Sequence, residues 1–172
     1  MHHHDEHCGC GHHHEHGEHC DCGHHHVEIP VPENMTAIQV NFLLALHQRG
    51  CLPIARFSYT KSDDEARYAV ALEPVFLSAV ADTMAQVKEI GNELIALEDM
   101  GLIWMEYDRP IQNYAYQEYK EAELYAYFAK TVKEAASKPN PTFDTPNLEI
   151  GSMVLSEEGE EMVRKLLNGE GA

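Results

Sequence analysis

The stretch from Glu93 to Tyr107, Glu-Leu-Ile-Ala-Leu-Glu-Asp-Met-Gly-Leu-Ile-Trp-Met-Glu-Tyr, changes from a helical to an extended pattern. Thr83 and Gln86 upstream form a capping box, which predicts that a helix begins there. Gly101 predicts its end. The apolar and aromatic run over 102–107 predicts a strand directly after it. Four apolar residues of this helix recur at helical spacing: Val87, Ile90, Leu94 and Leu97.

The rest of the chain from Val27 onward alternates helical and extended patterns in the same way. A second capping box, Thr36-x-x-Gln39, begins a helix that Gly50 ends. Further elements are predicted as strands over 55–60 and 67–72 joined by the turn 61–65, a short helix from Pro74 to about Ala81, and a helix over 120–136. These patterns place the body in the α+β class.

Two stretches of the body, in the correct order, resemble parts of one known fold. The run Glu93–Ile103 resembles the end of the recognition helix and the first wing strand of winged helix-turn-helix transcriptional regulators. The run Gly151-Ser-Met-Val-Leu-Ser-Glu-Glu-Gly159 and the apolar residues after it resemble their returning wing strand and closing helix. The likeness covers about 36–107 and 148–168. It implies a winged helix-like domain over 36–168, with the segment 110–147 as a helical insertion in the wing.

Residues 1–26 differ sharply in composition from the body. They hold twelve of the 13 histidines and four of the five cysteines, and beyond Met1 they have no large apolar side chain. We therefore predict a disordered or metal-ordered tail over 1–26, joined by an extended linker over 27–35 that contains two prolines.

The tail is a repeat with a period of 12 residues: 6–14 reads EHCGCGHHH and 18–26 reads EHCDCGHHH. Each unit supplies two thiolates and up to four imidazoles, enough for one tetrahedral site. Thiolates favour Zn(II) and Cu(I), while imidazoles also suit Ni(II), so the identity of the metal stays open. The predicted ligands are His7, Cys8, Cys10, His12, His13, His14, His19, Cys20, Cys22, His24, His25 and His26.

Three features of the body fit structural roles better than ligand-binding roles. Six of the eight tyrosines lie in 107–127, a pattern more typical of a core or a self-association surface than of a ligand pocket. Cys51 and His47 are interpreted as a small buried thiol and an imidazole on a helix surface, in preference to a ligand pair. Gly91 inside the second helix predicts close packing or a kink.

The charge of the chain opposes the DNA-binding function that the resemblance implies. Twelve Lys and Arg face 29 Asp and Glu, for a net charge of −17. The proposed recognition helix has a single basic residue among four carboxylates, and its predicted groove-facing positions include Asn92, Glu93, Ala96 and Asp99. The candidate DNA contacts are Lys88, Asn92, Arg56, Arg67 and Arg109.

Composition and motifs also indicate where the chain is located and which classes of function it lacks. No apolar run is long enough for a membrane span, and the N-terminus lacks the features of a secretory signal, so we expect a cytoplasmic chain with reduced thiols. Without a phosphate loop, an HExxH motif or a catalytic Cys/His pairing in the body, we expect no enzyme. Two hypotheses remain: a metal-responsive transcriptional regulator, acting as a homodimer, or a metal store or metallochaperone whose body does not bind DNA. Charge favours the second hypothesis, but fold likeness favours the first, and the regulator is the function that we expect from the sequence.

Overall fold

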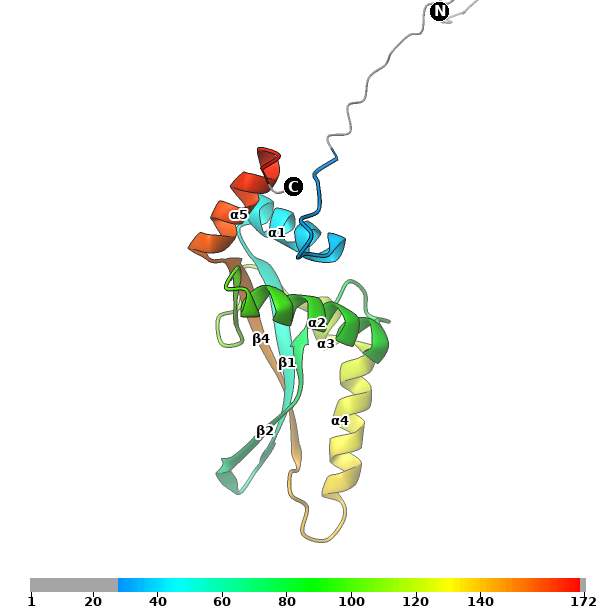
Figure 1. Cartoon of the computed structure of the whole chain (residues 1–172). Helices are drawn as coiled ribbons and strands as arrows, with labels where there is room; N and C mark the ends of the chain where they lie inside the picture. Colours follow the sequence, from blue (N-terminus) through cyan, green and yellow to red (C-terminus); the bar gives the residue numbers. More distant parts are fainter. Residues whose placement is uncertain (1–27, 171–172) are drawn as a thin grey trace, which may run out of the picture.

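The computed structural model describes residues 28–170, which form a mixed helix-and-sheet domain (Figure 1). The helices are α1 (Ala37–Arg49), α2 (Met84–Asp99), α3 (Gln117–Lys120), α4 (Glu123–Ala136) and α5 (Glu157–Leu167). The strands are β1 (Leu52–Lys61), β2 (Asp64–Val75), β3 (Ile103–Glu106) and β4 (Thr145–Leu155). The α+β class predicted from the sequence is confirmed.

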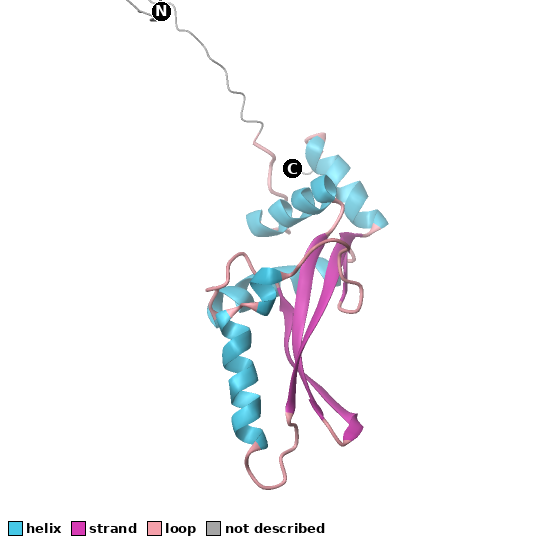
Figure 2. Ribbon diagram, turned by 180° about the vertical axis from the view of Figure 1, so that it is seen from behind, coloured by secondary structure: helices cyan, strands magenta, loops and turns pink. Residues whose placement is uncertain are grey.

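The strands of the described part form one antiparallel sheet in the order β2-β1-β4-β3. β1 pairs with β4 from Leu52↔Met153 to Thr60↔Thr145, whereas the short β3 pairs only with the C-terminal end of β4. The longer strands therefore continue away from the helices α1, α2 and α5, with α4 beside them (Figures 1 and 2). We call residues 28–55, 74–122 and 150–170 the head, and residues 56–73 and 123–149 the arm.

The head encloses the larger hydrophobic core, formed by α1, α2, α5 and the adjacent part of the sheet. The capping boxes predicted at Thr36 and Thr83 are both present. Gly91 is buried against β2, where a Cβ atom would lie 3.2 Å from the Pro74 carbonyl oxygen, so the close packing predicted there is confirmed. Buried residues of this core include Val40, Leu43, Leu46, Leu94, Leu97, Ile103, Met153, Val163 and Leu166.

The two stretches that carry the family resemblance contact each other at the base of β3 and β4. The Ser156 amide donates to the Leu102 carbonyl at 3.0 Å, and the Ser156 hydroxyl donates to the Gly101 carbonyl at 2.5 Å. A Cβ atom on Gly159 would lie 2.0 Å from the Leu102 carbonyl oxygen. Glycine at 159 is thus required by the approach of α5 to the start of β3.

A second core, at the junction of head and arm, contains the tyrosines of α3 and the loop before it. Tyr116 and Tyr119 are fully buried. The Tyr116 hydroxyl donates to the Gly151 carbonyl at 2.6 Å, and the Tyr119 hydroxyl accepts from the Leu77 amide at 3.2 Å. The core interpretation is confirmed for these two residues, whereas Tyr127 on α4 is 70% exposed.

Some predicted elements were wrong in kind or extent. Pro74 does not begin a helix, because β2 continues through it to Val75, which pairs with Ala55. The helix predicted over 120–136 is confirmed as α4, which begins three residues later than predicted, after the chain turns at the buried Ala122; the short α3 before it was not predicted. The winged-helix identity of the domain stays a prediction. None of the helices between residues 28 and 170 combines the length and apolar character needed to span a bilayer.

Candidate functional site

The predicted metal ligands of the repeat, residues 7–26, lie outside the described residues. Between residues 28 and 170, no group of three or more His, Cys, Asp and Glu side chains is arranged to hold a metal ion. His47 is exposed on α1, as predicted, with its Nδ1 3.0 Å from a Glu160 carboxylate oxygen. Cys51 is half-buried at the start of β1, so it is less enclosed than predicted.

The segment that follows the repeat is packed onto the head. Ile29 contacts the head core, Pro32 is buried, and Met35 is 8% exposed. The Met35 amide donates to the Pro32 carbonyl at 3.0 Å. From Ile29 onward, the segment predicted as an extended linker over 27–35 therefore has a fixed position, and the repeat is joined to the head.

The exposed face of α2 offers little to a phosphate backbone. Lys88 and Asn92 are exposed one turn apart, as the DNA-binding hypothesis needs. Glu93, predicted to face a groove, instead accepts hydrogen bonds from Gln39 at 2.7 Å and Thr36 at 2.9 Å, and so ties α2 to the start of α1. Three other carboxylates of α2 are exposed: Glu89, Glu98 and Asp99.

Arg56 on β1 is held inside a cluster on the sheet surface. Its guanidinium donates two hydrogen bonds to Glu149, at 2.9 and 3.0 Å, and a third to Glu73 at 3.4 Å. It also lies 4.8 Å from the centre of the Tyr107 ring and 5.8 Å from that of Tyr68. These partners occupy the guanidinium, which makes Arg56 a structural cation of the sheet.

The electrostatics of this cluster follow from its hydrogen bonds. The bonds to Glu149 raise the pKa of Arg56 well above its ordinary value, more than burial lowers it. Burial alone would raise the pKa of Glu149, but hydrogen bonds from Arg56 and Tyr68 outweigh it and lower that pKa to about 2. The Arg56–Glu149 pair therefore stays ionised at all moderate pH values.

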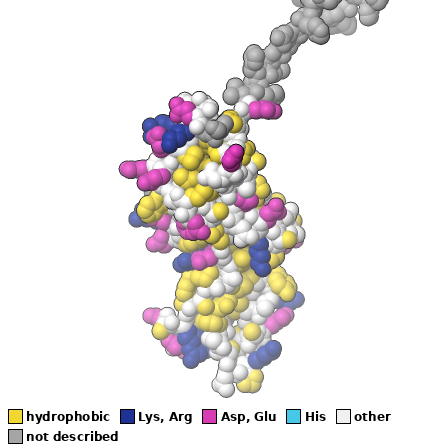
Figure 3. All heavy atoms as spheres, in the orientation of Figure 1, with side chains coloured by type: hydrophobic (Ala, Val, Ile, Leu, Met, Phe, Trp, Pro, Cys, Tyr) yellow, Lys and Arg dark blue, Asp and Glu magenta, His cyan; other side chains and the backbone are white. Residues whose placement is uncertain are grey.

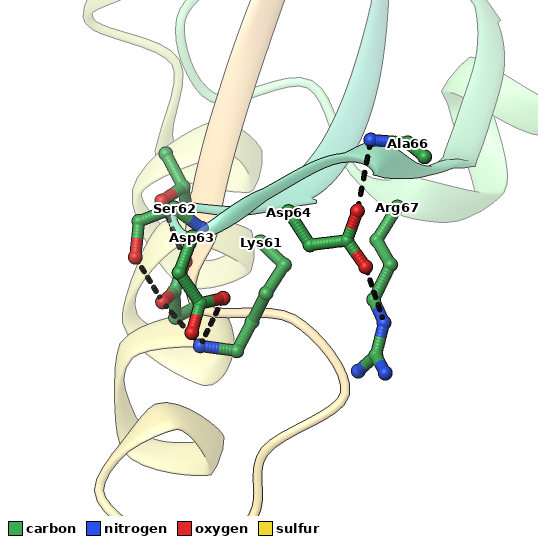
Figure 4. A network of polar contacts seen from close by, with 8 residues as sticks. Lys61, Ser62, Asp63, Asp64, Ala66 and Arg67 are labelled. Atoms are coloured by element: carbon green, nitrogen blue, oxygen red, sulfur yellow. Dashed lines mark hydrogen bonds and ion pairs between the residues drawn. The ribbon is translucent and has the colours of Figure 1, made fainter.

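The other two candidate arginines also have carboxylate partners. Arg67 lies 3.1 Å from Asp64 in the hairpin tip, and Arg109, just after β3, lies 3.0 Å from Glu106 (Figure 4 shows the first pair). The three arginines and Lys88 thus lie on β1, β2, the segment after β3 and α2. The predicted DNA contacts are spread over four parts of the chain, and their arginines are ion-paired.

Asp144, the residue before β4, holds the tip of the β1–β2 hairpin by hydrogen bonds. Sequence reasoning did not predict this role. Asp144 accepts hydrogen bonds from the Ser62 hydroxyl at 2.6 Å, the Ser62 amide at 2.9 Å and Lys61 at 3.1 Å. These bonds, led by that from Ser62, hold the pKa of Asp144 well below its ordinary value. All of these contacts lie within the arm, and they hold the hairpin tip against the residue before β4.

Within residues 28–170, two of the apolar grooves on the surface have phenylalanine side chains in their walls. The first, of about 420 Å³, lies in the arm between α4 and the hairpin, and Tyr59, Phe128 and Phe143 supply its aromatic walls. Hydrophobic side chains gather over this lower half of the molecule (Figure 3). The second, of about 390 Å³, lies in the head beside Phe42 and Phe76. Neither groove contains a group that indicates a reaction.

A third concavity, of about 600 Å³, lies where β3 and β4 meet α5, and we call it the wing cleft. It contains Trp104, the single tryptophan of the chain, with 60% of its surface exposed. Sequence reasoning missed this site, although the alternation of the strand carried the signal. Ile103 is buried, so Trp104 and Glu106 share the outward face.

Comparisons with known proteins define no family for this chain. No family model matches it, and no curated protein is similar to it at a significant level. A solved structure of an uncharacterized protein from the hydrocarbon-degrading marine bacterium Alcanivorax borkumensis SK2 aligns with 78% of this chain and 87% of its own. The identity is 15% and the TM-score 0.46.

Proposed function

We propose that this chain is a transition-metal-binding protein whose N-terminal repeat takes up metal ions and whose body is a protein–protein scaffold. The observation that carries the proposal is the repeat itself. The sequence Glu-His-Cys-x-Cys-Gly-His-His-His occurs twice, and each Cys and His has the same position in both copies. Each copy therefore contains enough thiolates and imidazoles to bind one metal ion. The cysteines make Zn(II) and Cu(I) the favoured ions, with Ni(II) as a histidine-bound alternative.

The charge distribution supports a scaffold role for the body. Sixteen carboxylates and six Lys and Arg residues belong to the head. The arginines proposed for DNA are ion-paired, as described above. A surface of this kind repels phosphates and attracts cationic partners. A metal store or metallochaperone with such a body is therefore the better account.

A metal-responsive transcriptional regulator is the second candidate. It is favoured by the order α2–β3–α3–α4–β4–α5, in which a helix runs through Gly101 into the first of two antiparallel strands, α3 and α4 are inserted between these strands, and a further helix follows them. This order is the one that the winged-helix resemblance implies. Such a regulator would act as a homodimer on a two-fold DNA site, because one wing offers few phosphate contacts.

Calorimetric titration of the full chain with Zn(II) tests the metal proposal. We expect about two ions per chain, one for each repeat unit. Replacing Cys8, Cys10, Cys20 and Cys22 by Ser should weaken Zn(II) binding strongly and leave part of the Ni(II) binding. The matched control is Cys51→Ser, which should change neither. A chain beginning at Val27 that kept the full stoichiometry would refute the assignment to the tail.

A mobility-shift assay on DNA upstream of the chain's own coding region, with and without metal, separates the two candidates. Binding that Lys88→Ala weakens, with a salt dependence that falls by roughly one phosphate contact, would support the regulator. We expect no shift in either metal state. Two divalent ions add four positive charges, but four thiols lose their protons on binding them, so metal alone does not make the chain basic.

A further inference from the structure

The wing cleft exposes the largest aromatic side chain of the protein on a strand pair. Trp104 lies directly opposite Val154 in the β3–β4 register, and these side chains are 60% and 38% exposed. An exposed tryptophan beside a second apolar residue is typical of the centre of a protein interface, where tryptophan is enriched among the residues that dominate binding.

Carboxylates surround this apolar pair. Glu106, Glu157 and Glu158 line the same cleft, and the only basic side chain among the residues lining it, Arg109, is 3.0 Å from Glu106. Glu157 and Glu158 are exposed in the first turn of α5. An aromatic ring with carboxylates beside it binds ammonium and guanidinium groups by cation–π attraction and ion pairing.

The backbone of the cleft offers a third element of recognition. β3 is at the edge of the sheet and, among the strands of residues 28–170, pairs only with β4. An edge strand can receive an extended peptide as an additional strand, with main-chain hydrogen bonds giving affinity and side-chain sites giving specificity. Trp104 and Glu106, on alternate positions of β3, would then meet alternate side chains of the peptide.

We propose that the wing cleft binds an extended, basic segment of a partner protein. A Lys or Arg of the segment lies over the Trp104 ring, its neighbouring cations face Glu157 and Glu158, and its backbone runs beside β3. The proposal names a partner for the scaffold role described above, but its geometry involves no residue of the metal-binding repeat.

Charge complementarity selects this occupant over two others. DNA would bring phosphates against three carboxylates, with Arg109 already paired. A second copy of the chain would bring one acidic head against another, since the head has far more carboxylates than cations. Only a basic partner gains from the charges of the cleft.

Trp104 provides its own reporter, because the chain contains no other tryptophan. The full-length protein is titrated with a capped peptide of alternating Lys and Val, and the emission of Trp104 is recorded. We expect a shift to shorter wavelength, and no shift with a peptide of alternating Glu and Val.

The double variant Glu157→Gln, Glu158→Gln should weaken binding of the basic peptide by about tenfold. The matched control, Glu33→Gln with Glu89→Gln, removes two exposed head carboxylates outside the cleft and should leave affinity nearly unchanged.

Several outcomes would overturn the proposal. One is the absence of a spectral change with the basic peptide. Another is equal weakening of peptide binding by both double variants, because that result would indicate general charge attraction. If the Trp104 emission shifted with duplex DNA and not with the basic peptide, the cleft would be assigned to nucleic acid. If the emission shifted with protein concentration and no ligand, the cleft would be assigned to self-association. The titration is repeated with the four tail cysteines replaced by Ser. Peptide binding should be unchanged there, so failure of the metal proposal and failure of this one are distinguishable.

Discussion

The head and the arm share the strands β1, β2 and β4 but differ in how those strands are buried. In the head, α1, α2 and α5 surround the end of the sheet, and the core there has many fully buried aliphatic residues. In the arm, α4 packs beside one face of the strands (Figure 2), and Arg56 on β1 is hydrogen-bonded to Glu149 on the adjacent β4. The head is held by apolar burial, whereas the arm combines one apolar face with ion pairs.

The charge of the two regions differs as well. The head contains sixteen carboxylates and six Lys and Arg residues, and the arm contains eight and six. The repeat joins the chain at the head, through the packed segment around Ile29 and Pro32. The acidic region is therefore the one nearest in sequence to the proposed metal ligands, while the arm is nearly balanced in charge.

The largest effect is expected in the head, for Gly159→Ala. A Cβ atom there would meet the Leu102 carbonyl oxygen at 2.0 Å, and backbone atoms on both sides cannot move aside without separating α5 from β3. We expect a loss of about 3 kcal/mol in the free energy of unfolding, measured by urea titration. Because β1 and β4 run through both regions, arm and head should unfold in the same transition.

Glu158→Ala is the control for this prediction, since Glu158 is exposed one residue earlier on α5. It should cost less than about 1 kcal/mol, the value of one favourable helix-dipole interaction. A Gly159→Ala protein as stable as the control would show that α5 does not approach Leu102 as described.

The sequence was most informative where neighbours along the chain determine structure. The capping boxes at Thr36 and Thr83 and the turn at Gly101 depend on residues a few positions apart, and both caps were predicted correctly. The run Gly151–Gly159 carries part of the family resemblance, but the contacts of Ser156 and Gly159 with Leu102 join residues far apart in sequence. Local patterns predicted the helix α2 and its boundaries, whereas only the tertiary structure explains why residue 159 is a glycine.

The second largest effect is expected from Glu149 in the arm. Its pKa is lowered to about 2 in the folded protein, so its contribution to stability is fully present above its ordinary pKa of 4.5 and is lost as pH falls from there towards 2. Allowing for partial exposure, we expect this contribution to be about 2 kcal/mol. Glu149→Gln should therefore be less stable than the natural chain at pH 7, and the difference should shrink by pH 3.

Urea titrations of both proteins across this pH range measure that difference directly. Asp144 titrates in both proteins, so its effect cancels. Glu65→Gln, a change at an exposed residue of the hairpin tip, serves as the control and should run parallel to the natural chain at every pH. A constant difference between Glu149→Gln and the natural chain would contradict the lowered pKa.

The partners of Arg56 could not be predicted from the sequence. Arg56 and Glu149 are opposite each other only because β1 and β4 pair in the register Arg56↔Glu149, although β2, α2, β3, α3 and α4 lie between them in the chain. No periodicity of either segment reports such a register. The same reason explains why Arg56 was interpreted as a possible DNA contact, and why the strand through Pro74 was mistaken for a helix start: its pairing with β1 and its packing on Gly91 are both tertiary.

A smaller effect is expected from truncation on the apolar face of the arm. Val132 on α4 is 8% exposed and lines the arm groove. Val132→Ala should cost about 1 kcal/mol, since it removes two methyl groups beside a groove whose walls can partly close. Leu94→Ala in the head core is the comparison and should cost about 3 kcal/mol, because that site is fully enclosed. Equal losses would show that the arm is packed as tightly as the head.

The smallest effect is expected when the tail is removed. A chain beginning at Val27 keeps Ile29, Pro32 and Met35, which contact or lie within the head, and loses only residues that contribute no large apolar side chain beyond Met1. Its free energy of unfolding should change by less than about 0.5 kcal/mol, the range of surface changes. The helical circular dichroism of the full chain should be unchanged when metal is chelated. A chain beginning at Asn34 tests the boundary, because it also loses the buried Pro32 and the contact of Ile29, and should be measurably less stable. If the chain beginning at Val27 were the one to lose stability, or if chelation lowered the helix content of the full chain, metal binding would be part of folding, and the separation between a metal-binding repeat and an independently folded head would be wrong.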